Sequence, residues 1–178
     1  MPSGETHDRI TLWSLPVIAG GTYLLTKGNS DRTLIVAGAF LFSGLMFGPD
    51  LDIYSVQYKR WGYLRWLWIP YQKTLKHRSF FSHGLIIGTT IRLIYLAFWL
   101  SLVGIFTVGI AELWGDVNWN WQLWAQLVKN YKYEWMALFI GLEMGAVSHI
   151  ISDRLGSFFK RRQRKRVNTD KIKKPTTK

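Results

Sequence analysis

Four apolar segments, separated by charged and aromatic stretches, limit most strongly how this chain can fold. They cover residues 10–26, 33–48, 85–111 and 135–151. A helix crosses the hydrocarbon core of a bilayer with about 20 apolar residues, in a range of roughly 17–25. The third segment meets this length easily and the others lie at the short limit, so a soluble all-helical fold stays open as an alternative. The pattern predicts an all-α, polytopic membrane protein with four transmembrane helices.

The stretch between the second and third apolar segments is polar and aromatic, as expected for a helix on a membrane surface. Aromatic residues make up 16% of the chain, and Trp and Tyr collect at membrane–water interfaces. Around residues 61–69, aromatic rings lie beside a charged edge, formed by Tyr63, Trp66 and Trp68 and by Lys59, Arg60 and Arg65. We therefore expect an interfacial helix between the second and third transmembrane helices.

The distribution of basic residues predicts the orientation in the membrane. If all four segments cross it, 18 of the 23 Lys and Arg residues fall on the side of both termini and four on the other side. Basic residues concentrate in cytoplasmic loops, so both termini are expected in the cytoplasm.

The last residues form a charge run that contributes much of the net charge of +12. We expect a membrane domain over residues 1–159 and a disordered basic tail over residues 160–178, because the tail has too few apolar side chains to fold alone. Anionic lipid headgroups are the expected partner of such a tail beside a membrane helix. Specific nucleic-acid binding is not expected, because the tail lacks interleaved aromatic residues that stack on bases.

The residues with chemical potential are histidines and aspartates, since the chain has no cysteine. The absence of cysteine excludes disulfides, thiolate zinc sites and cysteine nucleophiles. His149 and Asp153 are four residues apart, so on a helix they project from one face. Asp50 and Asp52 follow a Gly-Pro helix stop, and in an extended chain they face the same way.

Topology brings these residues to one layer, because alternating membrane helices place five separate parts of the chain at the cytoplasmic face. Taken singly, each residue has a plainer interpretation as an interfacial or capping residue; together they predict a metal site. Nitrogen and oxygen ligands suit Zn²⁺, Mn²⁺ or Fe²⁺, and the candidates exceed the needs of one zinc ion, so one or two ions are expected. The predicted ligands are His7, Asp50, Asp52, His77, His83, His149 and Asp153.

Three basic residues are candidates for contact with a substrate. Lys76 and Arg78 flank His77 and are suited to holding a phosphate. Arg92 and Glu143 are charges within apolar segments, where charges are usually paired or functional. We expect an ion pair between them, with a substrate contact by Arg92 as the alternative.

The elements Thr6-His7-Asp8, Gly48-Pro49-Asp50-Leu51-Asp52, His77-Arg78-x-x-x-Ser82-His83 and His149-x-x-x-Asp153 resemble a bacterial family of metal-binding proteins, DUF2227, common in cyanobacteria. The resemblance covers nearly the whole chain before the basic tail. The order of the elements is also similar to YdjM-like inner-membrane metal-dependent hydrolases. It implies the same seven ligands and a bacterial inner or thylakoid membrane, with Asp8 as an additional candidate that the broader group does not require.

Three classes of function follow from these features. The first is a membrane-embedded metal-dependent hydrolase that acts on a phosphoester or lipid-like substrate at the cytoplasmic face. The second is a non-enzymatic membrane scaffold or assembly factor with a structural metal site. The third is a membrane anchor that presents the basic tail to nucleic acid. A water-accessible site with an open coordination position favours the first, since structural sites are closed.

Overall fold

The computed structural model describes residues 4–115 and 120–173. The prediction of an all-α fold is confirmed, since the described residues form helices, turns and bends and no strand. In chain order the elements are α1 (Gly4–Leu25), α2 (Ser30–Leu45), the 3₁₀ helix η1 (Pro49–Asp52), α3 (Val56–Arg60), the 3₁₀ helix η2 (Gly62–Trp68), α4 (Ile69–Thr74), α5 (Phe80–His83), α6 (Ile87–Trp114), α7 (Trp121–Asn130) and α8 (Lys132–Lys173).

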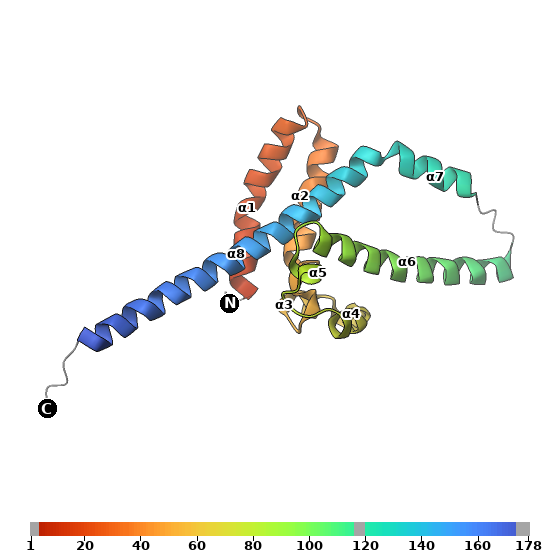
Figure 1. The fold of residues 1–178 in the computed structure, drawn as a ribbon. Coiled ribbons are helices and arrows are strands. Elements are labelled where there is room, and N and C mark those ends of the chain that lie inside the picture. The colour runs from red at the N-terminus through yellow and green to blue at the C-terminus, as the bar shows by residue number, and fades with distance from the viewer. Residues whose placement is uncertain (1–3, 116–119, 174–178) are drawn as a thin grey trace.

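Helices α1, α2 and α8 form the packed part of the molecule. α1 and α2 make an antiparallel hairpin, and α8 crosses both (Figure 1). Close approach depends on glycine: a Cβ at Gly141 or Gly145 would lie 2.4 Å and 2.7 Å from α2 carbonyl oxygens. Their spacing is that of the small-xxx-small motif of membrane helix pairs. Gly44 of α2 likewise contacts Thr11 of α1, whereas Gly38 has open space around it.

The short elements from η1 to α5 gather below the hairpin, near the N-terminal end of α1 (Figure 1). Their core is aromatic: Phe47, Trp68 and Tyr71 are almost completely buried, and the rings of Trp68 and Tyr71 lie 5.5 Å apart. The predicted interfacial helix is a 3₁₀ segment followed by α4, and its Tyr63 is 98% exposed. Placing Trp68 among the interfacial rings is wrong, because its side chain fills the centre of this core.

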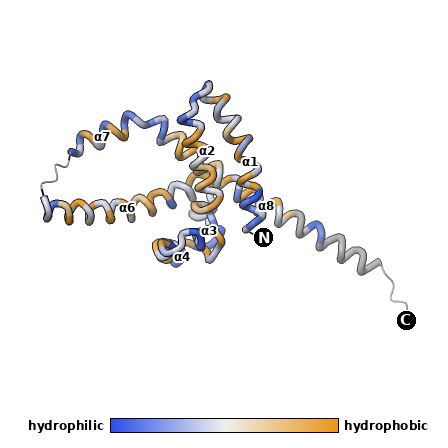
Figure 2. Tube along the Cα trace, turned by 180° about the vertical axis from the view of Figure 1, so that it is seen from behind, coloured by the Kyte–Doolittle hydropathy of each residue, from blue (hydrophilic) through white to orange (hydrophobic). Residues whose placement is uncertain are grey.

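Helices α6 and α7 extend away from the packed helices (Figure 1). Only the first turns of α6 are buried, through Gly88, Thr89 and Arg92, and apolar residues run along the remaining length (Figure 2). By length and composition, three of the described helical segments could cross a membrane: Ser30–Asp52, Ile87–Trp114 and Lys132–Phe158. The first predicted segment, within α1, is not among them, so four membrane crossings remain a prediction.

Helix α8 differs from the expectation for the basic tail. It continues without interruption to Lys173, where the sequence predicted disorder from Lys160 onward. Lys, Arg and Gln are good helix formers, and adding residues to an existing helix avoids the cost of nucleation. Residues 174–178 lie outside the described part of the chain. The division into a domain and a tail remains a prediction.

Candidate metal centre

All seven predicted ligands gather where the N-terminal turn of α1, η1, the α5 segment and the middle of α8 meet. The N-terminal turn of α1 supplies His7, and η1, which follows α2, supplies Asp50 and Asp52. The loop before α5, α5 itself and the middle of α8 supply the others. Six of the seven form two groups in which the candidate ligand atoms lie within 4.8 Å of one another: His7, His149 and Asp153, and Asp50, His77 and His83. We refer to these as group one and group two.

Group one is buried between α1 and α8. The Nε2 atom of His7 lies 3.2 Å from Oδ1 of Asp153, and the rings of His7 and His149 stack with centroids 4.1 Å apart. The sequence did not identify Ser152, whose hydroxyl contacts Nδ1 of His7 at 2.5 Å and donates to the carbonyl of His149. Because Nδ1 of His7 is engaged by Ser152, Nε2 is the atom that remains for a metal.

Group two is assembled around η1. His83 lies with Nε2 3.7 Å from Oδ1 of Asp50 and with Nδ1 2.8 Å from the hydroxyl of Ser82. Asp52 is outside the group: its Oδ1 hydrogen-bonds Nδ1 of His77 at 2.9 Å, and its Oδ2 lies 3.6 Å from Nδ1 of His83. A carboxylate on the far nitrogen of a ligating histidine fixes the ring and increases its basicity. Asp52 therefore has the position of an orienting residue.

Asp50 connects the two groups. Its Oδ1 faces His83 of group two, while its Oδ2 lies 3.2 Å from Nε2 of His149 in group one. The sequence argument placed Asp50 and Asp52 on one side of an extended chain, whereas Pro49–Asp52 is a 3₁₀ turn. The turn instead places the two carboxylates against different nitrogens of His83. The result is one carboxylate shared between two sets of histidines.

The hydrogen bonding of the site fits a metal. Buried polar atoms in proteins are normally paired, yet several candidate ligand atoms lack a hydrogen-bond partner among the described residues. Two of these unpaired atoms, Nε2 of His83 and Oδ1 of Asp50, lie 3.7 Å apart, which is too far for a hydrogen bond. A divalent cation would satisfy this set of donors. The unpaired ligand atoms are Oδ1 of Asp50, Nε2 of His83, Nδ1 and Nε2 of His149, and Oδ1 of Asp153.

The structure places Asp8, the additional candidate ligand, away from both groups. Its carboxylate accepts two hydrogen bonds from the guanidinium of Arg60 in α3, and this pairing raises the pKa of Arg60. Arg60 also donates to the carbonyl of Leu45 at the end of α2. Asp8 thus connects the start of α1 to α2 and α3, which fixes the neighbouring His7 at the site.

Arg92 is not placed to contact a substrate. Its side chain is 1% exposed, and it donates to the carbonyl of Ser82 and to the hydroxyl of Thr89, each at 3.0 Å. The expected ion pair with Glu143 is also wrong, because Oε1 of Glu143 instead accepts the backbone N–H of Ile86 at 2.8 Å. Arg92 holds the α5 segment that carries His83.

Tyr71 is buried, and it is close enough to Arg92 and Asp52 to interact with their charges. Burial raises the pKa of Tyr71 to about 12, so its phenol is protonated at neutral pH. A protonated phenol adds a donor, but no further charge, next to the carboxylate that orients the histidines of group two.

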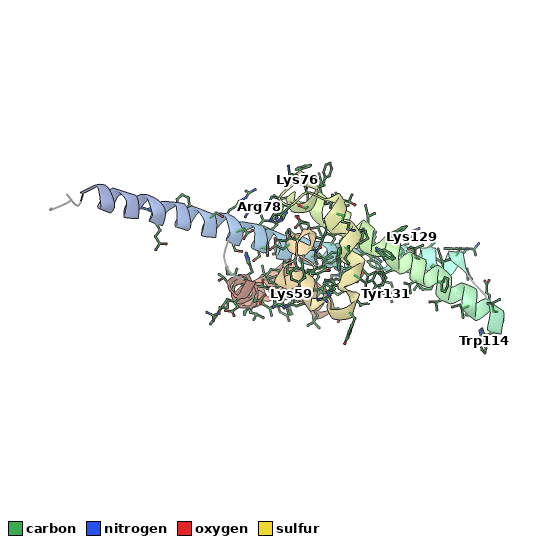
Figure 3. The ribbon with its side chains drawn as sticks, turned by 90° about the horizontal axis from the view of Figure 1, so that it is seen from below. Lys59, Lys76, Arg78, Trp114, Lys129 and Tyr131 are labelled. Carbon is green, nitrogen blue, oxygen red and sulfur yellow. The ribbon has the colours of Figure 1, made fainter. Side chains whose placement is uncertain are left out.

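Lys76 and Arg78, the predicted phosphate contacts, differ in position. Both side chains are exposed, and Arg78 lies between Lys76 and α8 in the view of Figure 3. Arg78 lines a cavity with His83 and Asp153, whereas Lys76 does not. A second basic residue of this cavity, Arg154, was counted in the sequence only as part of the charge asymmetry. The signal in the sequence that could have identified Arg154 as a residue of the site is its position directly after the candidate ligand Asp153.

Fold and site together define an all-α protein with two His/Asp groups suited to metal. The chain belongs to DUF2227, a family described as uncharacterized metal-binding proteins, whose profile matches residues 2–163. An uncharacterized protein of Aquifex aeolicus (strain VF5) is 34% identical over 58 residues, which cover 32% of this chain and 40% of that protein. The match thus spans less than half of that relative. No solved structure matches the chain.

Proposed function

We propose that this protein is a membrane-embedded, metal-dependent hydrolase with two divalent transition-metal ions, Zn²⁺, Mn²⁺ or Fe²⁺, at its cytoplasmic face. The observation that carries the proposal is the position of Asp50, with one carboxylate oxygen toward each group of histidines. Paired metal sites that share a bridging carboxylate are common among enzymes that hydrolyse phosphoesters. A phosphoester or lipid-like substrate at the membrane surface is the substrate class that we propose.

The residues of the chain divide into ligands and supports. His7, His149 and Asp153 would hold one ion, and His77 and His83 the other, with Asp50 between them. When bound, such a pair supplies Lewis acidity and a water of lowered pKa for hydrolysis. Ser152 and Asp52 hold the histidine rings in the orientation that leaves their other nitrogens free for a metal.

The membrane part of the proposal rests on composition and length. Three helical segments are long and apolar enough to cross a membrane, and α6 exposes most of its apolar side chains outside its first turns. The excess of basic residues on the side of the metal groups supports cytoplasmic termini, in a bacterial inner or thylakoid membrane. The basic end of α8 would then lie against anionic headgroups.

Topology reporters test the membrane arrangement. A reporter fused after Lys178 should behave as cytoplasmic, and a reporter inserted at Asn120, between α6 and α7, should behave as external. If both reporters lie on the same side, the predicted topology, in which an even number of crossings places the metal site at the cytoplasmic face, is wrong. Insertion at Asn130 provides a second external position, because only α7 separates it from Asn120.

Metal analysis of the purified protein tests the site. We expect about two transition-metal ions per chain when the purification is mild and free of chelators. A metal content below about 0.3 mol of transition metal per mol of purified protein would contradict the proposal. Hydrolysis is tested separately, by release of phosphate from phosphomonoesters and lipid phosphates by the metal-loaded protein, because a bound metal is not evidence of turnover.

The burial of group one favours a second function, a scaffold with a structural metal. His7, His149 and Asp153 are all less than 10% exposed, as in closed structural sites. Under this alternative neither ion exchanges readily and no substrate is turned over. A rapidly exchanging second ion supports the hydrolase, because catalytic sites keep an open coordination position.

A further inference from the structure

A cavity beside both metal groups has the composition of an anion site. It measures about 480 Å³ and is lined by His83 of group two and Asp153 of group one, together with Arg78, Arg154, Ser157 and Phe158. Its volume falls in the usual range for small-molecule sites, about 300–1,000 Å³. The cavity therefore contacts one ligand from each group, next to the place where a substrate would meet the metals.

The two arginines approach this cavity from different elements. Arg78 belongs to the loop before α5 and Arg154 to α8. Among the residues that the structure describes, no carboxylate lies within 4.0 Å of either guanidinium, although Asp153 is the direct neighbour of Arg154. Two unpaired guanidinium groups at one cavity create a positive potential that favours an anion.

The backbone at Arg78 is strained in a way that fixes its position. Its φ is +60°, which is a left-handed conformation that residues with a Cβ adopt rarely. The turn is closed by a hydrogen bond from the N–H of Ser79 to the carbonyl of Lys76 at 3.0 Å. Ser79 then caps α5, which carries His83. Strained residues of this kind cluster at binding sites, and Arg78 lines the cavity.

We infer that Arg78 and Arg154 form a phosphate subsite, in which the phosphate group of a substrate is held between two guanidiniums and faces the metal groups. Arginine forks bind anionic oxygens through paired, charge-assisted hydrogen bonds, which a neutral ester cannot match, and two forks at one cavity can together neutralise the charges of a phosphate group. This inference rests on the proposed hydrolase and narrows its substrate to a phosphoester. Lys76, which the sequence placed with Arg78, is outside the subsite.

The phosphate could be that of a soluble phosphoester or of a lipid headgroup, and both present the same chemistry to the arginines. Phe158 is 58% exposed at this cavity, and Ile150 adds an apolar wall. Two probes separate the sources: glycerol 3-phosphate in solution, and phosphatidic acid in bilayer nanodiscs of neutral lipid. Preference for the second assigns a lipid headgroup, and preference for the first assigns a soluble ester; binding of either through the arginines supports the subsite.

The experiment uses the full chain in nanodiscs, with metal content measured on every sample. Affinity for both probes is measured for the wild type and for Arg78→Gln, Arg154→Gln, Lys76→Gln and Arg9→Gln. Arg78→Gln and Arg154→Gln each remove one charged hydrogen-bond donor. Each should lower the affinity for the more tightly bound probe by about 10- to 100-fold. The other two should change it by less than about 2-fold, because neither residue lines the cavity.

The outcomes separate this inference from the proposed function. Unchanged affinity in both Arg78→Gln and Arg154→Gln, with full metal content, overturns the subsite. An equal loss in Lys76→Gln and Arg154→Gln also overturns it, because the binding would then follow general charge. If the wild-type protein is purified without metal, the proposed function is contradicted instead. A loss of phosphate affinity in Arg78→Gln and Arg154→Gln alone, measured relative to that metal-free wild type, still supports the subsite.

Discussion

The two metal groups have the same ligand types but different surroundings. In group one, His7, His149 and Asp153 are all buried. In group two, only Asp50 is buried, while His77 and His83 are partly accessible. One group is enclosed by α1 and α8, which are long helices, and the other is assembled by a 3₁₀ turn, a loop and one turn of helix.

Such a difference would let one site combine stability with access. An ion bound by the group that the long helices enclose would help to hold those helices together, and such closed sites are typical of structural metals. A group on short segments leaves room for water and substrate, as catalytic sites require. Asp50 joins the two, so the enclosed ion would fix the carboxylate that the accessible ion also uses.

The largest expected effect is that of Asp50→Asn. This change preserves the shape of the side chain but removes the charge from the residue that both groups share, so it should lower the content of both ions, from about two per chain to less than about 0.5. Metal analysis of detergent-purified protein measures this. Asp8→Asn is the matched control and should retain both ions, because Asp8 pairs with Arg60 and contacts neither group. Retention of one full ion by Asp50→Asn would show that the groups are independent.

The next effect concerns the rate of metal loss. A chelator should remove the group-two ion at least about 10-fold faster than the group-one ion, because its ligands are more accessible. In stopped-flow chelation, we expect two phases of similar amplitude. His77→Ala should eliminate the fast phase and His7→Ala the slow one. A single phase in the wild type, or loss of the same phase in both variants, would remove the distinction between an enclosed and an accessible group.

Much of the fold was predictable because helix formation follows local pattern. The four apolar segments each correspond to a helix, and the second helix ends at Leu45, shortly before the Gly48-Pro49 pair. What the sequence could not predict was which apolar residues are buried inside the protein and which remain exposed. Trp68 and Tyr63 have similar neighbours in sequence, yet one is completely buried and the other exposed. That choice depends on contacts between distant segments, such as Tyr95 donating to the carbonyl of Leu67.

The composition of the site was predictable because residue type and topology are both visible in the sequence. Alternating helices bring their ends to one layer, which is why His7 could be grouped with His149 across most of the chain. The division into two groups was not predictable, since it depends on how α8 is rotated against α1. The role of Asp52 followed from the 3₁₀ geometry of η1, and Ser152 was missed because serine is rarely considered in a ligand pattern.

A smaller effect is expected from Ser152→Ala. The hydroxyl of Ser152 holds Nδ1 of His7, and loss of such a partner typically costs about 10- to 100-fold in metal affinity. The loss should be confined to the slow, enclosed ion, which competition with a calibrated chelator measures. Ser157→Ala is a suitable control, because Ser157 lies on the same helix and lines the cavity without contacting a histidine in either group. Equal weakening of both ions by Ser152→Ala would mean that the groups share more than Asp50.

The smallest effect is expected from Arg60→Gln, which removes the partner of Asp8. This ion pair is partly exposed, and such pairs contribute about 0.2–1 kcal/mol to stability. A change of that size should lower the melting temperature by about 0.4–4 °C in a chain of this length. Because the pair fixes the start of α1, the enclosed ion should dissociate slightly faster, while the accessible ion, whose group has no ligand on α1, should be unaffected. Thermal unfolding and two-phase chelation measure both quantities on one sample. If Arg60→Gln instead accelerates the fast phase, then α1 supports the accessible group, and the two groups cannot be treated as separately held.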